Sequence, residues 1–209
     1  MFFTLRKVYQ GQSLLRILMN QSFKQFSVSG KVVDVGGARK PDYFDYLKQE
    51  SVTSVEIVDG LLSKVDFEKD KLPYADGYAD SVVLANVLEH VYNHAFLVAE
   101  VHRILKKGGT LVGFVPFLIQ YHPDPHDYFR YTKEALERIF KSAGFSQVQI
   151  VTVGRGPFSV NFNTIVLSFP RLVRVFLFPF YYAMDALFLK LRPRVGERYP
   201  LGYSFILKK

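Results

Sequence analysis

The sequence has no cysteine, and it lacks an uncharged apolar run as long as a membrane-spanning helix requires. Without cysteine, a disulfide framework, a thiolate metal site and a cysteine nucleophile are excluded. A spanning helix needs about 18 uncharged apolar residues, whereas the charge-free stretches at 156–170 and 175–184 contain polar residues or a proline. The N-terminus also lacks the cleavage site of a signal peptide. We therefore expect a protein of the reducing cytoplasm without a transmembrane span.

Negative charge is scarce at both ends of the chain. The net charge of +8 arises from +5 in residues 1–31 and +6 in residues 165–209, against −3 in residues 32–164. Basic ends around a more acidic middle indicate contact with an anionic surface, either a membrane or a nucleic acid. The same excess would also be explained by solubility alone.

Apolar runs that alternate with helical patterns predict an α/β fold. An amphipathic helical segment, interrupted at Gly11, precedes them. Strands are expected at 31–35, 51–58, 63–67, 78–85, 110–115, 146–153 and 199–207, and helices at 43–48, 93–105 and 132–143. The pattern predicts a Rossmann-like, seven-stranded, mostly parallel sheet with helices on both faces, plus an apolar helical insertion before the last strand. A ligand should then bind beyond the carboxyl ends of the strands.

One domain accounts for the whole length. We divide residues 1–209 into an N-terminal amphipathic helical segment (1–29), a core that binds the ligand (30–154), the apolar helical insertion (155–198) and a closing strand (199–209).

Carboxylates and glycines follow the first strands at regular distances. Gly36 and Gly37 come after the first strand, where backbone N–H groups can approach a ligand closely. Asp34, just before them, can hold this loop or meet a ligand's amino group. Glu56, in the second strand, is suited to accept both hydroxyls of a ribose. The three-glycine fingerprint of nicotinamide enzymes is absent, which disfavours an oxidoreductase.

The order of the segments VVDVGG, SVEI, VDFEKDKLPYADGYADSVVLANVLEHV and HRILKKGGTLVGFVPF resembles the class I S-adenosylmethionine-dependent methyltransferases, and more narrowly the methyltransferase type 11 family, over about residues 30–153. The resemblance implies S-adenosylmethionine as the cofactor. It places Gly36 and Gly37 by the methionine part, Glu56 at the ribose, Asp66 and Phe67 at the adenine, and Asn86 near the methionyl chain. The other residues expected to bind the cofactor are Asp34, Ala38 and Ile57. Ala38 and Lys40 depart from the family, which usually has glycine there.

The segment 122–132, His-Pro-Asp-Pro-His-Asp-Tyr-Phe-Arg-Tyr-Thr, resembles the acceptor loop of a subset of this family. A methyl acceptor that reacts at oxygen needs a base, most often histidine. The base candidates are His122, His126 and Asp127, and Tyr128 and Arg130 are candidates for orienting the acceptor. Alternatively, Asp127 and Arg130 only pair with each other. His122, Asp124, His126 and Asp127 could also ligate a metal, but no zinc spacing matches, so we expect no metal.

The insertion at 155–198 is rich in aromatic residues with scattered arginines and lysines, and Pro170 and Pro179 are expected to split it into short helices. This composition suits a segment that lies on an anionic membrane, at its inner face. Less strongly, it suits a lid over an apolar acceptor, and less again the interface of a homo-oligomer.

We therefore expect a methyltransferase that acts at oxygen on a small-molecule, lipid-linked or glycan-precursor acceptor. The alternative is a non-catalytic module that binds S-adenosylmethionine or a degenerate methyltransferase fold. Methylation of nucleic acid is disfavoured, because no base-flipping tetrad of the Asn/Asp-Pro-Pro-aromatic type is present.

Overall fold

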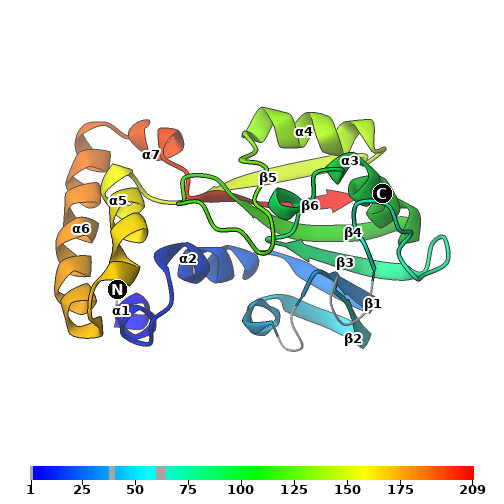
Figure 1. Cartoon of the computed structure of the whole chain (residues 1–209), viewed down its shortest axis with the longest axis horizontal. Coiled ribbons are helices and arrows are strands. Elements are labelled where there is room, and N and C mark those ends of the chain that lie inside the picture. Colours follow the sequence, from blue (N-terminus) through cyan, green and yellow to red (C-terminus); the bar gives the residue numbers. More distant parts are fainter. Residues whose placement is uncertain (1, 38–40, 60–64) are drawn as a thin grey trace.

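The computed structural model describes residues 2–37, 41–59 and 65–209. In these residues six strands form one sheet in the order β2-β1-β3-β4-β6-β5 (Figure 1). The strands are β1 (Ser27–Val35), β2 (Lys48–Val58), β3 (Ala79–Ala85), β4 (Leu105–Pro116), β5 (Gln147–Val153) and β6 (Gly202–Lys208). All neighbours pair in parallel except β6, which is antiparallel to β4 and β5. The sheet is therefore mixed and Rossmann-like, as predicted.

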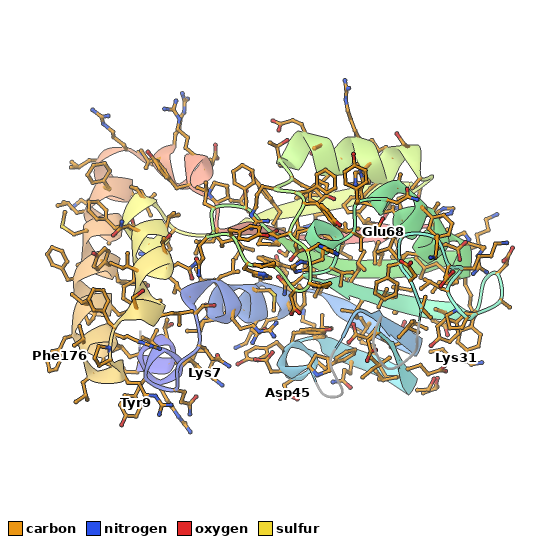
Figure 2. The ribbon with its side chains drawn as sticks, viewed as in Figure 1. Lys7, Tyr9, Lys31, Asp45, Glu68 and Phe176 are labelled. Carbon is orange, nitrogen blue, oxygen red and sulfur yellow. The ribbon has the colours of Figure 1, made fainter. Side chains whose placement is uncertain are left out.

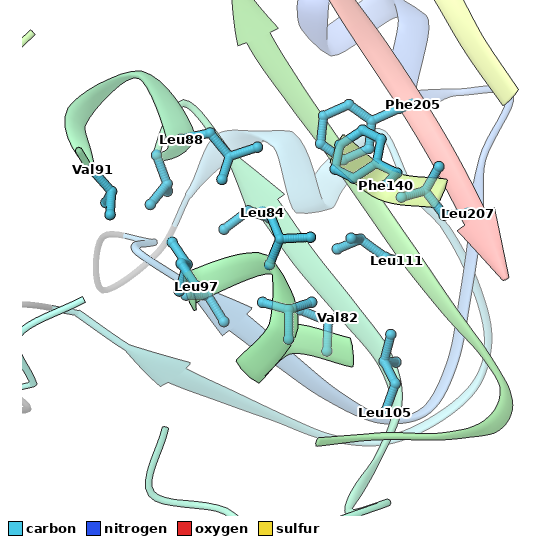
Figure 3. Packing of buried hydrophobic residues seen from close by; sticks show 14 of the residues in the cluster. Val82, Leu84, Leu88, Val91, Leu97, Leu105, Leu111, Phe140, Phe205 and Leu207 are labelled. Atoms are coloured by element: carbon cyan, nitrogen blue, oxygen red, sulfur yellow. The ribbon is translucent and has the colours of Figure 1, made fainter. Parts of the chain in front are cut away.

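Helices cover both faces of the sheet. α3 (His94–Ile104) and α4 (Lys133–Ser142) lie on one face, and α2 (Leu14–Phe23) with the 3-10 helix η1 (Asp42–Asp45) lies on the other (Figure 1). β3 is buried along almost its whole length because it is covered on both sides, which explains its continuous apolar run. The larger core cluster joins α3, α4 and β6 through side chains such as Leu97, Phe140 and Phe205 (Figure 3).

A separate helical lobe lies beyond one end of the sheet (Figure 1). It consists of α1 (Phe2–Tyr9), α5 (Pro157–Ile165), η3 (Val166–Ser168), α6 (Arg171–Leu191) and α7 (Val195–Arg198). Its own buried cluster joins the N-terminal segment to the insertion, since Val8 and Ile17 pack with Phe162 and Phe178. The N-terminal segment and the insertion, predicted as separate pieces, therefore fold together.

The prediction of seven strands is wrong in the described part of the chain, where the sheet has six. The missing strand was expected at 63–67. Ser63 and Lys64 lie outside the described residues, and residues 65–67 form a loop that enters a turn. The turn is favoured because the Asp66 carboxylate accepts a hydrogen bond from the Glu68 backbone N–H at 3.0 Å, which bends the chain.

Three local predictions were also wrong. The helix expected at 43–48 is only η1, because Lys48 already pairs with Ser27 in the sheet. The strand expected at 110–115 begins earlier, because β4 already starts at Leu105, and the carbonyl groups at the end of α3 are capped by Lys209, whose Nζ donates to the His102 oxygen at 2.7 Å. Pro179 does not split the insertion.

α6 is a continuous helix of 21 residues with Pro179 inside it. In the described part of the chain, it is the one helix long and apolar enough to cross a membrane by length and composition. The expectation of short helices in this region is therefore wrong, whereas the expectation of no transmembrane span stays a prediction.

Candidate functional site at the carboxyl edge of the sheet

The parallel strands end on the side of the sheet that faces the helical lobe (Figure 1). The loops that follow β1, β3 and β4 meet at this edge, which is where open α/β sheets bind ligands. The predicted site residues belong mainly to these loops.

The loop after β1 needs its two glycines for different reasons. Gly36 has a positive φ of 81°, and a Cβ there would come within 2.4 Å of Val87 Cγ2, from the loop after β3. At Gly37 a Cβ would come within 1.9 Å of Asp34 Oδ2. The backbone therefore runs directly over the Asp34 carboxylate. Ala38 lies outside the described residues.

Asp34 is fully buried in β1, and both its oxygens accept hydrogen bonds from the Tyr43 hydroxyl, at 2.8 and 2.7 Å. Burial raises the pKa of Asp34 to about 7, although the hydrogen bond from Tyr43 acts in the opposite direction. Burial and the neighbouring Asp34 carboxyl together raise the pKa of Tyr43. Of the two roles expected for Asp34, this geometry favours holding the loop.

At β2 the expected ribose carboxylate lies slightly inside the strand. β2 continues to Val58, so Glu56 and Ile57, both half-buried, precede its end. Glu56 Oε1 accepts a hydrogen bond from the Tyr78 hydroxyl at 2.5 Å. Asp59 is the first residue after the strand. It is a second carboxylate at this position that the sequence reasoning missed, although its place after an apolar strand was a usable signal.

Asp66 is exposed, and its carboxylate makes contacts within the turn that it begins, where it also pairs with Lys69 at 3.1 Å. The Glu68 backbone N–H and Lys69 lower its pKa. Phe67 is half-buried against the main core. Glu68, also missed, accepts hydrogen bonds from the Tyr92 and Asn93 backbone N–H groups, at 2.6 and 2.7 Å. It thereby ties the turn at 66–70 to the start of α3.

Asn86 follows β3 and has a positive φ of 56°, which is uncommon outside glycine and concentrates at functional sites. Its backbone N–H donates to the Phe114 oxygen of β4 at 2.9 Å. Its side-chain Nδ2 lies 3.3 Å from Met19 Sδ, so α2 covers this part of the edge. The loops after β1 and β3 and the helix α2 therefore enclose one region.

In the acceptor loop, Asp127 and Arg130 form the pair foreseen as the structural alternative. Arg130 donates to both Asp127 oxygens, at 2.5 and 2.6 Å, and the His122 backbone N–H donates to Oδ2 at 2.9 Å. These contacts lower the pKa of Asp127, with Arg130 as the main cause. An acid held this way is a weak base, and its geometry suits holding the loop. The base candidates His122 and His126 remain, with His122 half-buried and His126 exposed.

The acceptor loop packs on the 3-10 helix η2 (Leu88–His90). The Tyr128 backbone N–H donates to the Glu89 oxygen at 2.8 Å, and the Tyr131 hydroxyl donates to the Leu88 oxygen at 3.0 Å. The His126 ring lies 5.3 Å from the ring of Tyr128, which is 43% exposed. Burial raises the pKa of Glu89 to about 8. Aromatic and imidazole rings thus line an open face next to a buried carboxyl group.

Comparison with protein-family models finds one related domain. Residues 36–113 match the methyltransferase type 11 model, described as a methyltransferase domain. No curated protein sequence matches the chain.

Solved structures share the fold over 93–100% of the chain. An S-adenosylmethionine-dependent methyltransferase from Archaeoglobus fulgidus is 17% identical with a TM-score of 0.57, covering 100% of this chain and 99% of its own. One from Thermotoga maritima is 13% identical with a TM-score of 0.58, covering 100% and 94%. The [4+2]-cyclase SpnF is 15% identical with a TM-score of 0.53, covering 93% and 80%.

Proposed function

We propose that this chain, whose residues 36–113 match the methyltransferase type 11 model and whose fold is that of S-adenosylmethionine-dependent methyltransferases, transfers the methyl group of S-adenosylmethionine to an oxygen of a small, lipid-linked or glycan-precursor acceptor. The observation that carries the proposal is the edge built from Gly36, Gly37 and Asn86, where two positions have positive φ and the glycines leave no room for a Cβ. Such a cradle suits close approach of backbone to a ligand.

Different residues of this chain would contact different parts of the cofactor. Gly36 and Gly37 would border the methionine part. Asp34, hydrogen-bonded to Tyr43, would support the loop that contains these glycines. Glu56 or Asp59 would accept the ribose hydroxyls, and Phe67 would pack on the adenine. When bound, S-adenosylmethionine supplies an electrophilic methyl group, so the protein mainly has to align the acceptor with it.

For the acceptor, His126 is the proposed base, because its ring is exposed beside Tyr128. It would take the proton of an acceptor hydroxyl as the new O–CH₃ bond forms. Asp127 and Arg130 would hold the loop in place rather than react.

Calorimetry with S-adenosylhomocysteine tests the cofactor half of the proposal. Micromolar binding to the wild type and its loss in Gly37→Ala are expected, while Gly196→Ala, a glycine of the helical lobe, should bind normally. Absence of any heat from the wild type would favour a degenerate fold. Because SpnF shares this fold as a cyclase, the transfer itself needs a test.

Transfer is tested by incubating the protein with S-adenosylmethionine labelled in its methyl group and with polar lipid extracts. Label should appear in the organic phase with the wild type, should fall about 100-fold in His126→Ala, and should be unaffected in His102→Ala. Cofactor binding without any label transfer to lipid, glycan-precursor or small-molecule fractions would support the non-catalytic alternative.

The helical lobe is the basis for proposing a membrane-bound setting. Leu172, Phe176, Phe180, Leu187 and Leu191 of α6 are 52–81% exposed. At 3.6 residues per turn they fall within about 100° of arc, so they form one stripe. Phe176 points outward from the lobe (Figure 2). An exposed apolar stripe of this kind on a folded protein marks an interaction surface.

The charge of the lobe indicates which surface this is. The helices α1 and α5 to α7 and their connecting loops carry basic side chains such as Arg6, Lys7 and Arg192, whereas their acidic residues are Asp185 and Glu197. Asp185 is fully buried. Apolar residues with surrounding lysines and arginines are typical of helices that lie in the interface of an anionic bilayer. We therefore place the protein at the cytoplasmic face of a membrane.

Two hydrogen bonds argue that α6 lies on the membrane rather than across it. Asp185 accepts from the Phe158 and Ser159 backbone N–H groups at 3.0 and 2.8 Å, which joins α6 to the first turn of α5. A spanning α6 would lose these bonds and expose the carboxylate to lipid, at a cost of several kcal/mol.

Co-sedimentation with vesicles tests this part. The wild type should bind phosphatidylglycerol vesicles at low salt and bind neutral phosphatidylcholine vesicles weakly. The double variant Phe176→Ser, Phe180→Ser should lose binding, while Val55→Ser, an exposed apolar residue of β2, should retain it. Wild-type protein that stays in the supernatant, or dimers that only the double variant disrupts, would instead favour an oligomer interface.

A further inference from the structure

Glu89 is buried without a hydrogen-bonding partner for its carboxylate. Its side chain is 1% exposed, and neither Oε1 nor Oε2 receives a hydrogen bond. An ionised carboxylate in that position is costly unless a cation compensates it. The structure therefore leaves a buried carboxyl group in the floor of the acceptor region, which would ionise readily only with a cation beside it.

Two imidazoles converge on this carboxylate. One ligand atom each from Glu89, His90 and His122 lies within 4.8 Å of the others. The His90 and His122 rings stack at 4.9 Å between centroids. Glu89 and His90 come from η2 and His122 from the acceptor loop, so only the tertiary structure brings them together.

A backbone contact determines which nitrogen of His90 faces Glu89. His90 Nδ1 is hydrogen-bonded to the backbone oxygen of His126. A carbonyl oxygen can only accept, so Nδ1 carries the proton and the neutral ring presents a lone pair on Nε2. Histidines that bind metals are commonly held by this kind of bond from their other nitrogen.

The distance between the two groups distinguishes a metal from a shared proton. His90 Nε2 lies 3.7 Å from Glu89 Oε1, which is too long for a hydrogen bond between them. Two ligands of one ion with bonds of about 2.1 Å are separated by roughly 3–4 Å. Two electron-rich atoms at this distance suit a cation between them.

We propose that Glu89, His90 and His122 bind one divalent transition-metal ion, such as Zn²⁺. Two imidazoles and one carboxylate favour these metals over Mg²⁺ or Ca²⁺, which prefer oxygen ligands. Three protein ligands would leave coordination positions for the acceptor. This differs from the ligand set considered from the sequence, because Asp127 is paired with Arg130 and the decisive carboxylate is Glu89.

The site also suggests a substrate class, an inference that rests on the proposed function. An acceptor that presents a hydroxyl group, with a neighbouring oxygen as a second ligand, could bind the ion. A bound hydroxyl has a lowered pKa, so its proton passes more easily to His126. Its oxygen then forms the bond to the methyl carbon while the carbon–sulfur bond of the donor breaks, leaving S-adenosylhomocysteine.

Titration calorimetry with Zn²⁺ on the full-length protein, stripped with a chelator, tests the site without any methyl donor. We expect one ion per chain for the wild type, with at least about 100-fold weaker binding in Glu89→Gln and His122→Ala. His102→Ala is the matched control, since His102 packs against Phe145 in another part of the protein, and it should bind as the wild type does. Circular dichroism serves to check that each variant is folded. His122→Ala removes a side chain of the acceptor loop and none of the buried core.

Equal Zn²⁺ affinity in wild type, Glu89→Gln and His122→Ala would overturn the proposal, as would absence of binding by the wild type. A visible spectrum with Co²⁺ gives a second measurement, because ligation by imidazole and carboxylate should produce absorption bands that vanish in Glu89→Gln. Binding of Zn²⁺ without transfer activity would leave the metal site intact and refute only the proposed function.

Discussion

The buried Asp34 carboxyl predicts an unusual dependence of folding stability on pH. Its pKa is about 7 in the folded protein against an ordinary value of 3.8. Below about pH 4 the carboxyl is protonated in both states and contributes nothing. Between about pH 4 and pH 7 the unfolded chain releases this proton while the folded protein keeps it, so stability falls as pH rises. The loss should reach about 4 kcal/mol and be complete above about pH 7.

The assay is urea unfolding followed by circular dichroism in chelator-containing buffers. Relative to Asp34→Asn, which keeps the shape of the side chain and cannot ionise, the wild type should lose about 1.4 kcal/mol per pH unit between about pH 5 and pH 7. Other groups, including Glu89, titrate equally in both proteins and cancel in the difference. Parallel stability curves for the two proteins would refute the reasoning.

Tyr43→Phe is a second variant whose effect has a definite sign. The Tyr43 hydroxyl donates to both Asp34 oxygens and lowers the pKa of that carboxyl. Its removal should therefore raise the Asp34 pKa further and extend the loss of stability to higher pH. A shift to lower pH would show that Tyr43 does not stabilise the ionised form.

Three further substitutions have expected outcomes. Gly37→Ala should lower the melting temperature, because the new Cβ would lie 1.9 Å from Asp34 Oδ2; an unchanged melting temperature would mean that the loop adjusts freely. Asp185→Ala should destabilise the protein by about 2–4 kcal/mol in urea unfolding, since one buried and one half-buried N–H group lose their acceptor. A free energy of unfolding equal to that of the wild type would count against this. Lys209→Ala should cost about 1 kcal/mol by removing the cap of α3, measured against Lys107→Ala, an exposed lysine.

Much of the fold was predictable because local signals and tertiary packing agree. The run at 79–85 is apolar throughout since β3 is covered on both faces. A helix was expected at 132–143, and α4 forms at Lys133–Ser142, where the Thr132 hydroxyl caps it by accepting from the Ala135 N–H at 3.2 Å. The glycines after β1 and the carboxylates near them were also recognisable, because their spacing along alternating strands and helices places them at one edge.

The sequence by itself thus determined the alternation of strands and helices, the methyltransferase resemblance and the loops that carry candidate site residues. Only the tertiary structure decided that the N-terminal helices and the insertion share one lobe, that Pro179 lies within a continuous α6, and that Asp127 pairs with Arg130. It alone brought Glu89 and His90 to His122. The reason is physical: propensity and periodicity report on neighbours along the chain, whereas burial, pairing and metal-binding geometry depend on residues that meet only after the chain has folded.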